Sequence, residues 1–425
     1  TDVVRLDPRL VGYAFAIRFF FDAASDPAMG FLSDRTASPL GRRRPFFLLG
    51  AIPAALAFYL LLAPPAAGET ATFLYLTVTS SGLILSLTIF GIPYYALSWE
   101  LTSNYDERTR IAAYRRFVEV GAEVLATMSI PLLLTVLAED QADSSFAAAR
   151  IYPTAAVLIG AVAVVAAFIT FFGTTETRRR ESRTSAGFLA SMRAAAENKP
   201  FVILLATFTL VAAADQVVTS LLFFVMEHLH GVPKQDANSL FLAFFLGSLA
   251  SPALWLLLGK RIGKKRAYVL ALCCWGATFT AFAITTWPPT TLHGIALLMG
   301  ASSSGVFLLP DAILPDVIEW EQIRTGERRE GIYAGIATFF RKLGTGGCFL
   351  VVGHLLHAID YVGGTPPTPN VLTGLRIIFI GLPGALLAAA LLVFRFYPIT
   401  AGAFRRMVGD LESRGESAVE TGTPE

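Results

Sequence analysis

Eleven segments of this chain are candidates for α-helices that cross a lipid bilayer. A spanning helix needs about 20 mostly apolar residues, because the hydrocarbon core of a bilayer is about 30 Å thick. Charged residues make up only 16% of the chain, against about 25% in soluble domains. We therefore expect an all-α, polytopic membrane protein with helices at residues 11–31, 45–63, 71–97, 111–138, 151–173, 200–227, 237–259, 266–287, 291–318, 331–357 and 372–398.

Basic residues are concentrated in one set of the loops between these segments. Of the 34 Lys and Arg residues, 26 lie in that set and 5 in the opposite set, while Arg18, Arg341 and Lys342 lie within helices. An excess of basic residues marks the cytoplasmic loops of a membrane protein. We therefore predict that the polar stretch 174–199 and a disordered tail at 404–425 are cytoplasmic.

The polar stretch divides the predicted helices into five before it and six after it. Two related halves are the usual plan of a secondary transporter, and the sequence does not begin with Met. We expect an N-terminal bundle at 1–173 that lacks its first helix and a six-helix bundle at 200–403; the alternative is a genuine eleven-helix protein. Short basic turns flanked by glycine at 30–44 and 259–266 form a weak internal repeat.

Three ionisable side chains share one face of the first predicted helix. Arg18, Asp22 and Asp26 are spaced four residues apart, and Asp22 lies about 15 Å from the cytoplasmic end of the helix. Charges at that depth are costly and usually mark an ion or substrate pathway. Two carboxylates so close together either bind a cation or take up a proton. The structural alternative is that Arg18 simply neutralises Asp22.

Two other predicted helices place ionisable residues at a similar depth. Lys342 lies about 16 Å into its helix, and Glu119 and Glu123 lie about 12 and 18 Å into theirs. Convergence of several helices near the midplane is typical of the binding site of a secondary transporter. The structural alternative is that the two glutamates pair with Arg115 and Arg116 at the end of their own helix.

The remaining polar residues in apolar segments carry no recognisable catalytic chemistry. Asp215 and Asp311 are interpreted as structural or gating groups. The sequence contains no Ser/His, Cys/His or metal-binding constellation and no phosphate-binding glycine loop, so we predict neither an enzyme nor a bound cofactor. The three cysteines lie in apolar runs, which indicates buried thiols and not a disulfide framework.

An ordered set of motifs over nearly the whole chain resembles the glycoside–pentoside–hexuronide:cation symporter family of the major facilitator superfamily. The motifs are Asp22-Ala-Ala-Ser-Asp26-Pro27-Ala-Met-Gly30, Ser33-Asp34-Arg35-Thr36, Gly41-Arg42-Arg43-Arg44-Pro45, Ile92-Pro93-Tyr94, Asp106-Glu107-Arg108-Thr109-Arg110, Leu314-Pro315-Asp316-Val317-Ile318, Thr325-Gly326-Glu327-Arg328-Arg329-Glu330-Gly331 and Arg341-Lys342-Leu343-Gly344. One departure is Gly91, which stands where sugar carriers of the family have an aspartate.

The resemblance implies a role for each matching residue. The coupling cation, Na+ or H+, is expected at Asp22, Ser25, Asp26 and Thr88. Substrate binding or coupling is implied in the same way for Arg116 and Lys342, with Tyr95 as an aromatic platform. Apart from the resemblance, we expect the same role for Arg18, Glu119, Glu123 and Thr338. A gating loop is expected to contain Gly30, Asp34, Arg35, Gly41, Arg42 and Arg43.

From these observations we expect a cation-coupled symporter that works by alternating access in the inner (plasma) membrane. The expected solute is a sugar, a glycoside or a sugar acid, and the alternative is a lysophospholipid carried with Na+ on the same fold. We expect a monomer whose partners are the solute and the lipid bilayer, with no nucleic acid. A sensor or scaffold that does not transport is disfavoured because the paired acids are retained.

Overall fold

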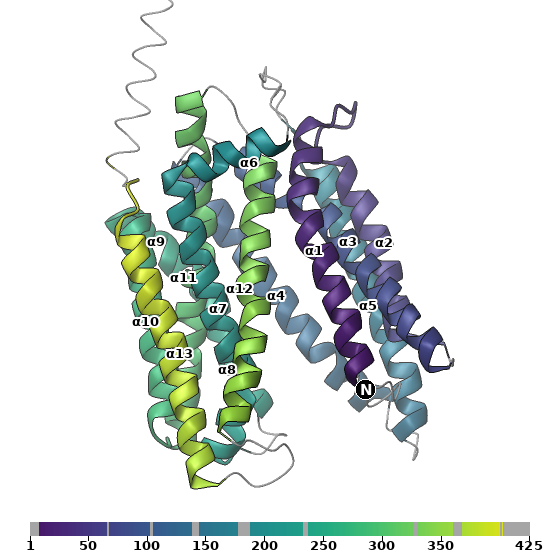
Figure 1. The fold of residues 1–425 in the computed structure, drawn as a ribbon, viewed down its shortest axis with the longest axis vertical. Coiled ribbons are helices and arrows are strands. Elements are labelled where there is room, and N and C mark those ends of the chain that lie inside the picture. The colour runs from purple at the N-terminus through teal and green to yellow at the C-terminus, as the bar shows by residue number, and fades with distance from the viewer. Residues whose placement is uncertain are drawn as a thin grey trace, which may run out of the picture. The chain divides into compact units, whose positions relative to one another are not determined.

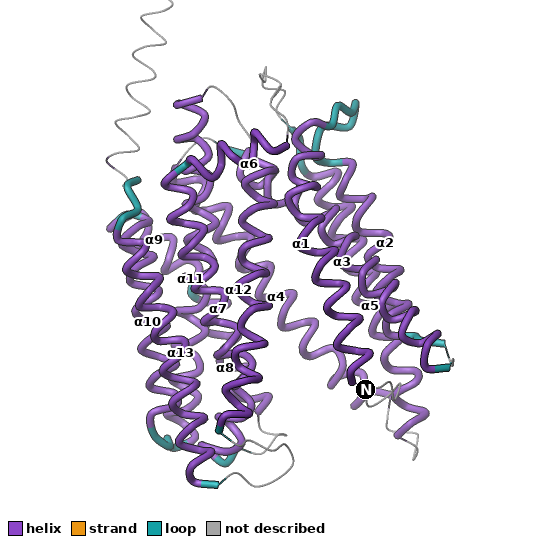
Figure 2. Tube along the Cα trace, viewed as in Figure 1, coloured by secondary structure: helices purple, strands orange, loops and turns teal. Residues whose placement is uncertain are grey.

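Long α-helices make up the structure, a computed structural model in which residues 8–65, 68–102, 105–137, 144–176, 188–232, 237–325, 330–359, 368–399 and 402 are described. Within these residues there is no β-strand (Figures 1 and 2). The elements are α1 (Pro8–Arg35), α2 (Pro45–Leu62), α3 (Glu69–Glu100), α4 (Tyr105–Leu137), α5 (Ser144–Gly173), α6 (Phe188–Glu197), α7 (Lys199–Phe224), η1 (Val225–Leu229), α8 (Ala237–Ala250), α9 (Pro252–Ile262), α10 (Lys264–Ile284), α11 (Pro289–Thr325), α12 (Glu330–Ala358) and α13 (Pro369–Arg395).

Each of the eleven predicted segments overlaps a described helix. The segment at 200–227 continues from α7 into the π-helical turn η1, and the segment at 237–259 is a pair, α8 and α9, bent by 41°. Among the described residues, seven helices are long and apolar enough to cross a membrane, or eight if the bent pair is one span. Helices α1, α4 and α12 are not among them, and these three carry most of the ionisable residues of the predicted site.

The helices form two compact units that do not follow chain order. Unit 1 comprises Thr1–Leu101, Ala122–Met192 and Arg329–Phe339, and unit 2 comprises Thr102–Gly121, Arg193–Arg328 and Phe340–Glu425. Helices α4, α6 and α12 are therefore each divided between the units. The predicted division into bundles at 1–173 and 200–403 stays a prediction, and the predicted tail at 404–425 lies outside the described residues.

Unit 1 is built on contacts of α3 with α1 and α2 and of α2 with α5. Phe47, Leu97 and Phe171 form a buried cluster, against which Phe90 and Tyr94 pack. Large apolar side chains also cover the outer faces of these helices, where lipid is their natural solvent. Exposed examples are Leu49, Leu56, Val78, Ile169 and Phe172.

Glycines bring the first turns of α12 into backbone contact with α1 within unit 1. A Cβ atom at Gly30 would lie 2.1 Å from the carbonyl oxygen of Gly331, and one at Gly335 would lie 2.5 Å from the carbonyl oxygen of Asp26. Small residues at four-residue spacing permit this close approach of helices in membranes. The start of α12 is thereby held against the part of α1 that carries Asp26 and Asp34.

Unit 2 is built on contacts of α11 with α8 and α10 and of α7 with α13. Helices α8 and α11 approach at two glycines, because a Cβ atom at Gly247 would lie 1.9 Å from the carbonyl oxygen of Leu297 and one at Gly300 would lie 1.8 Å from that of Phe244. The Trp255 indole, from the bent part of this span, donates to the carbonyl oxygen of Ala301 at 2.7 Å. Helix α11 is thus a central element of the unit.

Candidate functional site

The four residues predicted to bind the cation lie together on α1 and α3 in unit 1. Asp22 and Asp26 are both buried, with relative exposures of 7% and 0%. The hydroxyl of Thr88 donates to Asp26 Oδ1 at 2.9 Å. The hydroxyl of Ser25 donates to the carbonyl oxygen of Asp22 at 3.2 Å and lies 3.5 Å from the Thr88 hydroxyl. Two carboxylates and two hydroxyls form a set of oxygen atoms of the kind that hard cations prefer.

A proline supports this group by changing the backbone of α1. Pro27 lies inside the helix, and proline has no N–H to donate to the carbonyl four residues earlier. The carbonyl of residue 23, between the two acids, therefore lacks its usual helical donor. Pro27 thereby changes the helical hydrogen bonding of α1 between the two acids.

Asp34, at the end of α1, caps the first turn of α12. Its two carboxylate oxygens accept hydrogen bonds from the backbone N–H groups of Gly331 at 2.9 Å and Ile332 at 3.0 Å. The first N–H groups of a helix have no partner within the helix, and a carboxylate there also interacts favourably with the helix dipole. Burial raises the pKa of Asp34, while the guanidinium groups of Arg43 and Arg42 oppose this shift.

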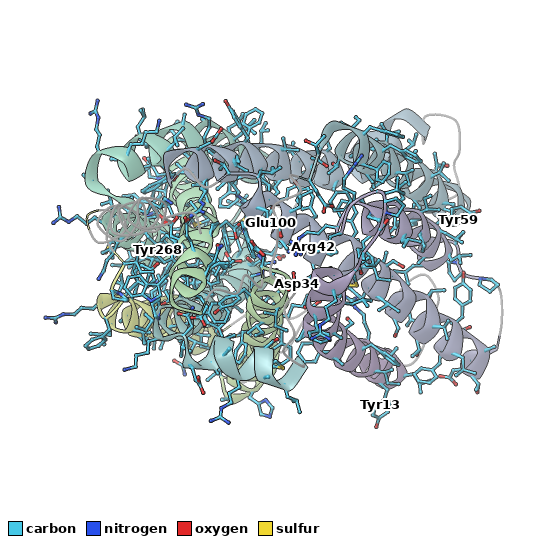
Figure 3. All side chains as sticks on the ribbon, turned by 90° about the horizontal axis from the view of Figure 1, so that it is seen from above. Tyr13, Asp34, Arg42, Tyr59, Glu100 and Tyr268 are labelled. Carbon is cyan, nitrogen blue, oxygen red and sulfur yellow. The ribbon has the colours of Figure 1, made fainter. Side chains whose placement is uncertain are left out.

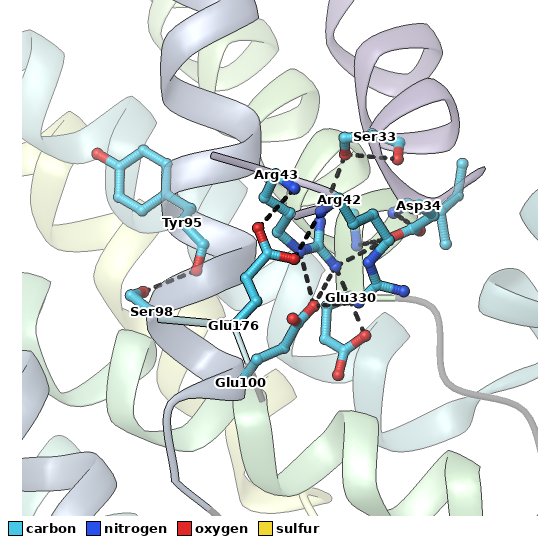
Figure 4. A network of polar contacts seen from close by, with 12 residues as sticks. Ser33, Asp34, Arg42, Arg43, Tyr95, Ser98, Glu100, Glu176 and Glu330 are labelled. Carbon is cyan, nitrogen blue, oxygen red and sulfur yellow. Dashed lines mark hydrogen bonds and ion pairs between the residues drawn. The ribbon is translucent and has the colours of Figure 1, made fainter. Parts of the chain in front are cut away.

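Arg43 is the buried centre of the predicted gating loop. Its guanidinium group donates to Asp34 at 2.9 Å, forms a very short contact with Glu100, and lies 3.6 Å from Glu330 (Figure 4). Arg42 also donates to Glu100, at 2.8 Å, and Figure 3 shows Asp34, Arg42 and Glu100 lying close together. Burial lowers the pKa of Arg43, but the carboxylates of Glu100, Asp34 and Glu330 outweigh this effect and raise the pKa above its ordinary value.

Glu176 holds the backbone of the same loop. Its carboxylate accepts hydrogen bonds from the backbone N–H groups of Arg42 at 2.7 Å, Arg43 at 2.8 Å and Arg44 at 3.0 Å. The loop can present three N–H groups to one carboxylate because Gly41 has φ = 104°, a conformation that favours glycine. Glu176, which lies three positions after the end of α5, therefore fixes the turn between α1 and α2.

Unit 2 contains a network of the same kind at the corresponding basic turn. Lys264 donates to Asp316 Oδ2 at 2.7 Å and to the carbonyl oxygen of Ala312 at 2.9 Å. Arg108 donates to Asp316 Oδ1 at 3.0 Å and also pairs with Glu319. Lys264, Arg108 and Asp316 are all nearly fully buried, so the charges are paired away from solvent.

The backbone of the two basic turns extends the internal repeat seen in the sequence. Gly41 and Gly263 both have positive φ, at 104° and 85°. Each is followed within two residues by a fully buried basic side chain, Arg43 or Lys264. In both units this side chain binds a helix acid, Asp34 at the end of α1 or Asp316 within α11.

The predicted substrate and coupling residues are divided between the units. Arg18, Tyr95, Glu123 and Thr338 belong to unit 1, and Arg116, Glu119 and Lys342 belong to unit 2. The structure brings Arg116 and Glu119 together, 3.7 Å apart, which agrees with the structural interpretation of this glutamate. Tyr95 packs against the rings of Tyr94 and Trp99. Glu123 is exposed and Lys342 is half-buried.

Several residues of these networks were not predicted from the sequence. Glu100, Glu176 and Glu330 are partners of the basic loop, and each lies at or next to a helix end. The sequence signal that could have identified these three glutamates is an acidic residue at the end of an apolar segment, where it can face a buried basic loop. In contrast, Arg35 was predicted in the gating loop but is exposed, and its guanidinium group lies 4.3 Å above the ring of Phe31.

Long apolar helices with paired acids buried inside them are the features of a membrane transporter of the secondary type. The sequence profile described as "MFS/sugar transport protein" matches residues 1–401. The chain belongs to this family, and with its relatives to the glycoside–pentoside–hexuronide:cation symporters of the major facilitator superfamily.

Relatives at about a quarter identity extend along almost the whole chain. A putative glycoside/cation symporter of Escherichia coli is 26% identical and covers 100% of this chain and 92% of the relative. An isoprimeverose transporter of Lactiplantibacillus pentosus is 26% identical, covering 97% and 86%. A sodium-dependent lysophosphatidylcholine symporter of Danio rerio is 25% identical, covering 94% and 80%.

Solved structures show the same fold. The fucose:proton symporter of E. coli superposes with a TM-score of 0.67 at 15% identity, covering 92% of both chains. A proton:xylose symporter superposes with a TM-score of 0.63 at 11% identity, covering 95% of this chain and 91% of the other. The likeness establishes the major facilitator fold of this transporter.

Proposed function

We propose that this transporter is a cation-coupled symporter that works by alternating access, with the cation held by Asp22, Ser25, Asp26 and Thr88. The observation that carries the proposal is the burial of two carboxylates one helical turn apart, with a threonine hydroxyl 2.9 Å from one of them. Two ionised carboxylates in such surroundings require a compensating positive charge. A bound Na+ supplies that charge, and proton uptake removes the need for it.

The proposed solute is a sugar, a glycoside or a sugar acid. Support comes from the relatives named as a glycoside/cation symporter and an isoprimeverose transporter. On α3, Tyr95 lies one turn after Gly91, so both residues are on one helix face. A Cβ atom at Gly91 would meet no described atom within 4 Å. This open position next to an aromatic ring suits a sugar ring stacked on Tyr95.

A lysophospholipid carried with Na+ is the second candidate. The lysophosphatidylcholine symporter among the relatives favours it, and so does Gly91, because the acid that sugar carriers of the family have at this position is absent. We further propose a monomer in the inner (plasma) membrane, with the basic loops and the C-terminus on the cytoplasmic side, as the charge bias predicts.

The test is uptake by the purified full chain in proteoliposomes. Labelled glycosides, a sugar acid and a lysophospholipid are offered under an imposed Na+ gradient or an imposed pH gradient. We expect accumulation of one solute class with one of the two gradients, and its loss in Asp26→Asn. Glu69→Gln is the control, because Glu69 is an exposed acid in the first turn of α3. Accumulation by Asp26→Asn equal to that of the unaltered chain contradicts the proposal.

A further inference from the structure

Within unit 2, two adjacent arginines of α4 are buried against two carboxylates. Arg115 donates to Glu119 Oε1 at 3.1 Å and forms a very short ion pair with Asp311 of α11. The guanidinium group of Arg116 lies 3.7 Å from the other carboxylate oxygen of Glu119. Two positive and two negative groups from two helices thus form one cluster.

The same cluster includes the less buried face of this part of α11. Phe307 and Asp311 are one turn apart and half-buried, whereas residues 302–306, 308–310 and 312–318 are buried. The Arg116 guanidinium carbon lies 5.6 Å from the centre of the Phe307 ring, within reach of a cation–π interaction. An aromatic ring and a charged group therefore point from α11 toward the arginines of α4.

The cluster lies deep within the membrane-spanning part of α11. The apolar span covers Pro289–Gln322, and Asp311 is eleven residues from its end at Gln322, which is about 16 Å along the helix. Ionisable groups at this depth face the interior of the bundle or a water-filled cavity, and they mark substrate pathways. The network at Asp316, one and a half turns nearer the helix end, is in contrast almost fully buried.

The basic and the acidic side chains of this cluster differ in their exposure. The arginine side chains are only 6% and 10% exposed, while Asp311 is 20% and Glu119 34% exposed. The guanidinium groups are therefore the buried part of the cluster, and the carboxylates are its more exposed part. Guanidinium groups bind carboxylates, sulfonates and phosphates through paired, charge-assisted hydrogen bonds.

We propose that Arg115, beside Arg116, binds a negatively charged oxyanion group of the transported solute, and that Asp311 is the internal anion which this group displaces from Arg115. The inference rests on the proposed transport function and narrows its solute class to molecules that carry a carboxylate, sulfonate or phosphate. A neutral hydroxyl cannot replace the carboxylate, because a buried guanidinium group that loses its counter-charge is strongly destabilised. Asp311 is then a residue that determines specificity.

The test measures binding at equilibrium to the purified full chain in detergent, without an ion gradient. Two matched probe pairs differ by charge: methyl β-D-glucuronide against methyl β-D-glucoside, and lysophosphatidylglycerol against a monoacylglycerol of equal chain length. The first pair represents a sugar acid and the second a lipid headgroup. We expect one anionic probe to bind more tightly than its neutral counterpart. The pair that shows this preference identifies whether the oxyanion belongs to a sugar acid or to a lipid headgroup.

Asp311→Asn removes the internal competitor and should increase the affinity for that anionic probe by about tenfold, the factor that corresponds to one charge-assisted hydrogen bond. Affinity for the neutral probe should not change. Arg115→Gln should abolish the preference for the anion. Glu319→Gln is the matched control, because Glu319 is also an arginine-paired acid of α11 but pairs with Arg108; it should leave the ratio of the two affinities unchanged.

Equal affinity for the charged and neutral members of both pairs overturns the proposal, and so does an absence of binding by all four probes. It is equally overturned if Asp311→Asn lowers the melting temperature but leaves the ratio of affinities as it was, because the cluster is then only structural. Since no gradient is applied, these results do not depend on whether Asp22 and Asp26 bind the coupling cation.

Discussion

Removing the carboxylate of Asp34 should release the first turn of α12. In Asp34→Ala the backbone N–H groups of Gly331 and Ile332 lose their acceptors, and loss of a helix cap costs about 1–2 kcal/mol. Arg43 also loses one of its carboxylates, but it keeps Glu100, so the cost stays below the roughly 3–5 kcal/mol of a fully broken buried pair. We estimate a total of about 3 kcal/mol.

Hydrogen exchange reports this loss locally, because amide protons exchange when a segment opens. A cost of about 3 kcal/mol corresponds to about 100-fold faster exchange, since 1.4 kcal/mol is a factor of ten. The measurement is hydrogen–deuterium exchange with mass spectrometry on peptides that cover residues 330–340. Asp34→Asn keeps one acceptor oxygen and should show a smaller increase, about 30-fold for roughly 2 kcal/mol.

Glu197→Ala is the matched control for this experiment. Glu197 also pairs with an arginine, Arg193, at 3.0 Å, but the two side chains are 59% and 84% exposed. Exposed ion pairs contribute about 0–1 kcal/mol, so exchange near Glu197 should increase less than about fivefold. Unchanged exchange at 330–340 in Asp34→Ala, or an equal increase throughout the chain, would refute the reasoning.

Three further predictions concern single contacts. Thr88→Val should raise the concentration of the coupling cation for half-maximal uptake about tenfold or more, as expected for a lost hydrogen bond to a charged group, whereas Thr77→Val on the same helix should not. Gly335→Ala should lower the melting temperature, because its Cβ would lie 2.5 Å from a backbone oxygen, whereas Gly384→Ala meets no described atom within 4 Å. Stability should fall as the pH drops below about 6.5, because burial lowers the pKa of His230, and His230→Gln should weaken this dependence.

The sign of the last prediction follows from the direction of the shift. A histidine whose pKa is lowered by folding takes up its proton more readily in the unfolded chain, so the stabilisation is complete above the unfolded pKa and is lost as pH falls through the folded one. The Nε2–H group of His230 donates a hydrogen bond to the carbonyl oxygen of Phe282, 2.7 Å away, because a carbonyl oxygen can only accept. Thermal unfolding between pH 5 and 8 measures the effect; identical pH profiles for the two chains would contradict it.

The predictions for Thr88 and Gly335 can be contradicted in an equally direct way. A cation dependence of uptake that Thr88→Val leaves unchanged, or that Thr77→Val shifts by the same factor, would show that the Thr88 hydroxyl does not contribute to cation binding. Equal melting temperatures for Gly335→Ala and Gly384→Ala would mean that the contact of α1 with α12 tolerates a methyl group.

The sequence was sufficient to place the helices and the acid pair, because both depend on local periodicity. Asp22 and Asp26 are on one helix face wherever α1 packs, and apolar runs of about 20 residues become helices in lipid whatever surrounds them. The proximity of Thr88 came from family resemblance, since no local pattern joins residues 62 positions apart. The structure supplies the contact, a hydrogen bond from Thr88 to Asp26.

The buried charge networks could not be predicted in the same way. A run of arginines at 42–44 is typical of a solvated cytoplasmic turn, yet Arg43 is fully buried. Its burial depends on carboxylates from three other segments, Asp34, Glu100 and Glu330, and such long-range pairing leaves no periodic signal. The pairing of Arg115 with Asp311 is of the same kind, 196 residues apart.

The central claim is that Asp22 and Asp26 couple solute movement to a cation, and the most direct measurement compares two transport modes of one proteoliposome preparation. Concentrative uptake driven by the cation gradient needs the coupling site, whereas exchange of labelled for unlabelled solute without a gradient needs only the solute site and the movement between states. We predict that Asp22→Asn and Asp26→Asn abolish gradient-driven accumulation and retain exchange. Accumulation by both variants at the level of the unaltered chain would contradict the assignment of the cation site.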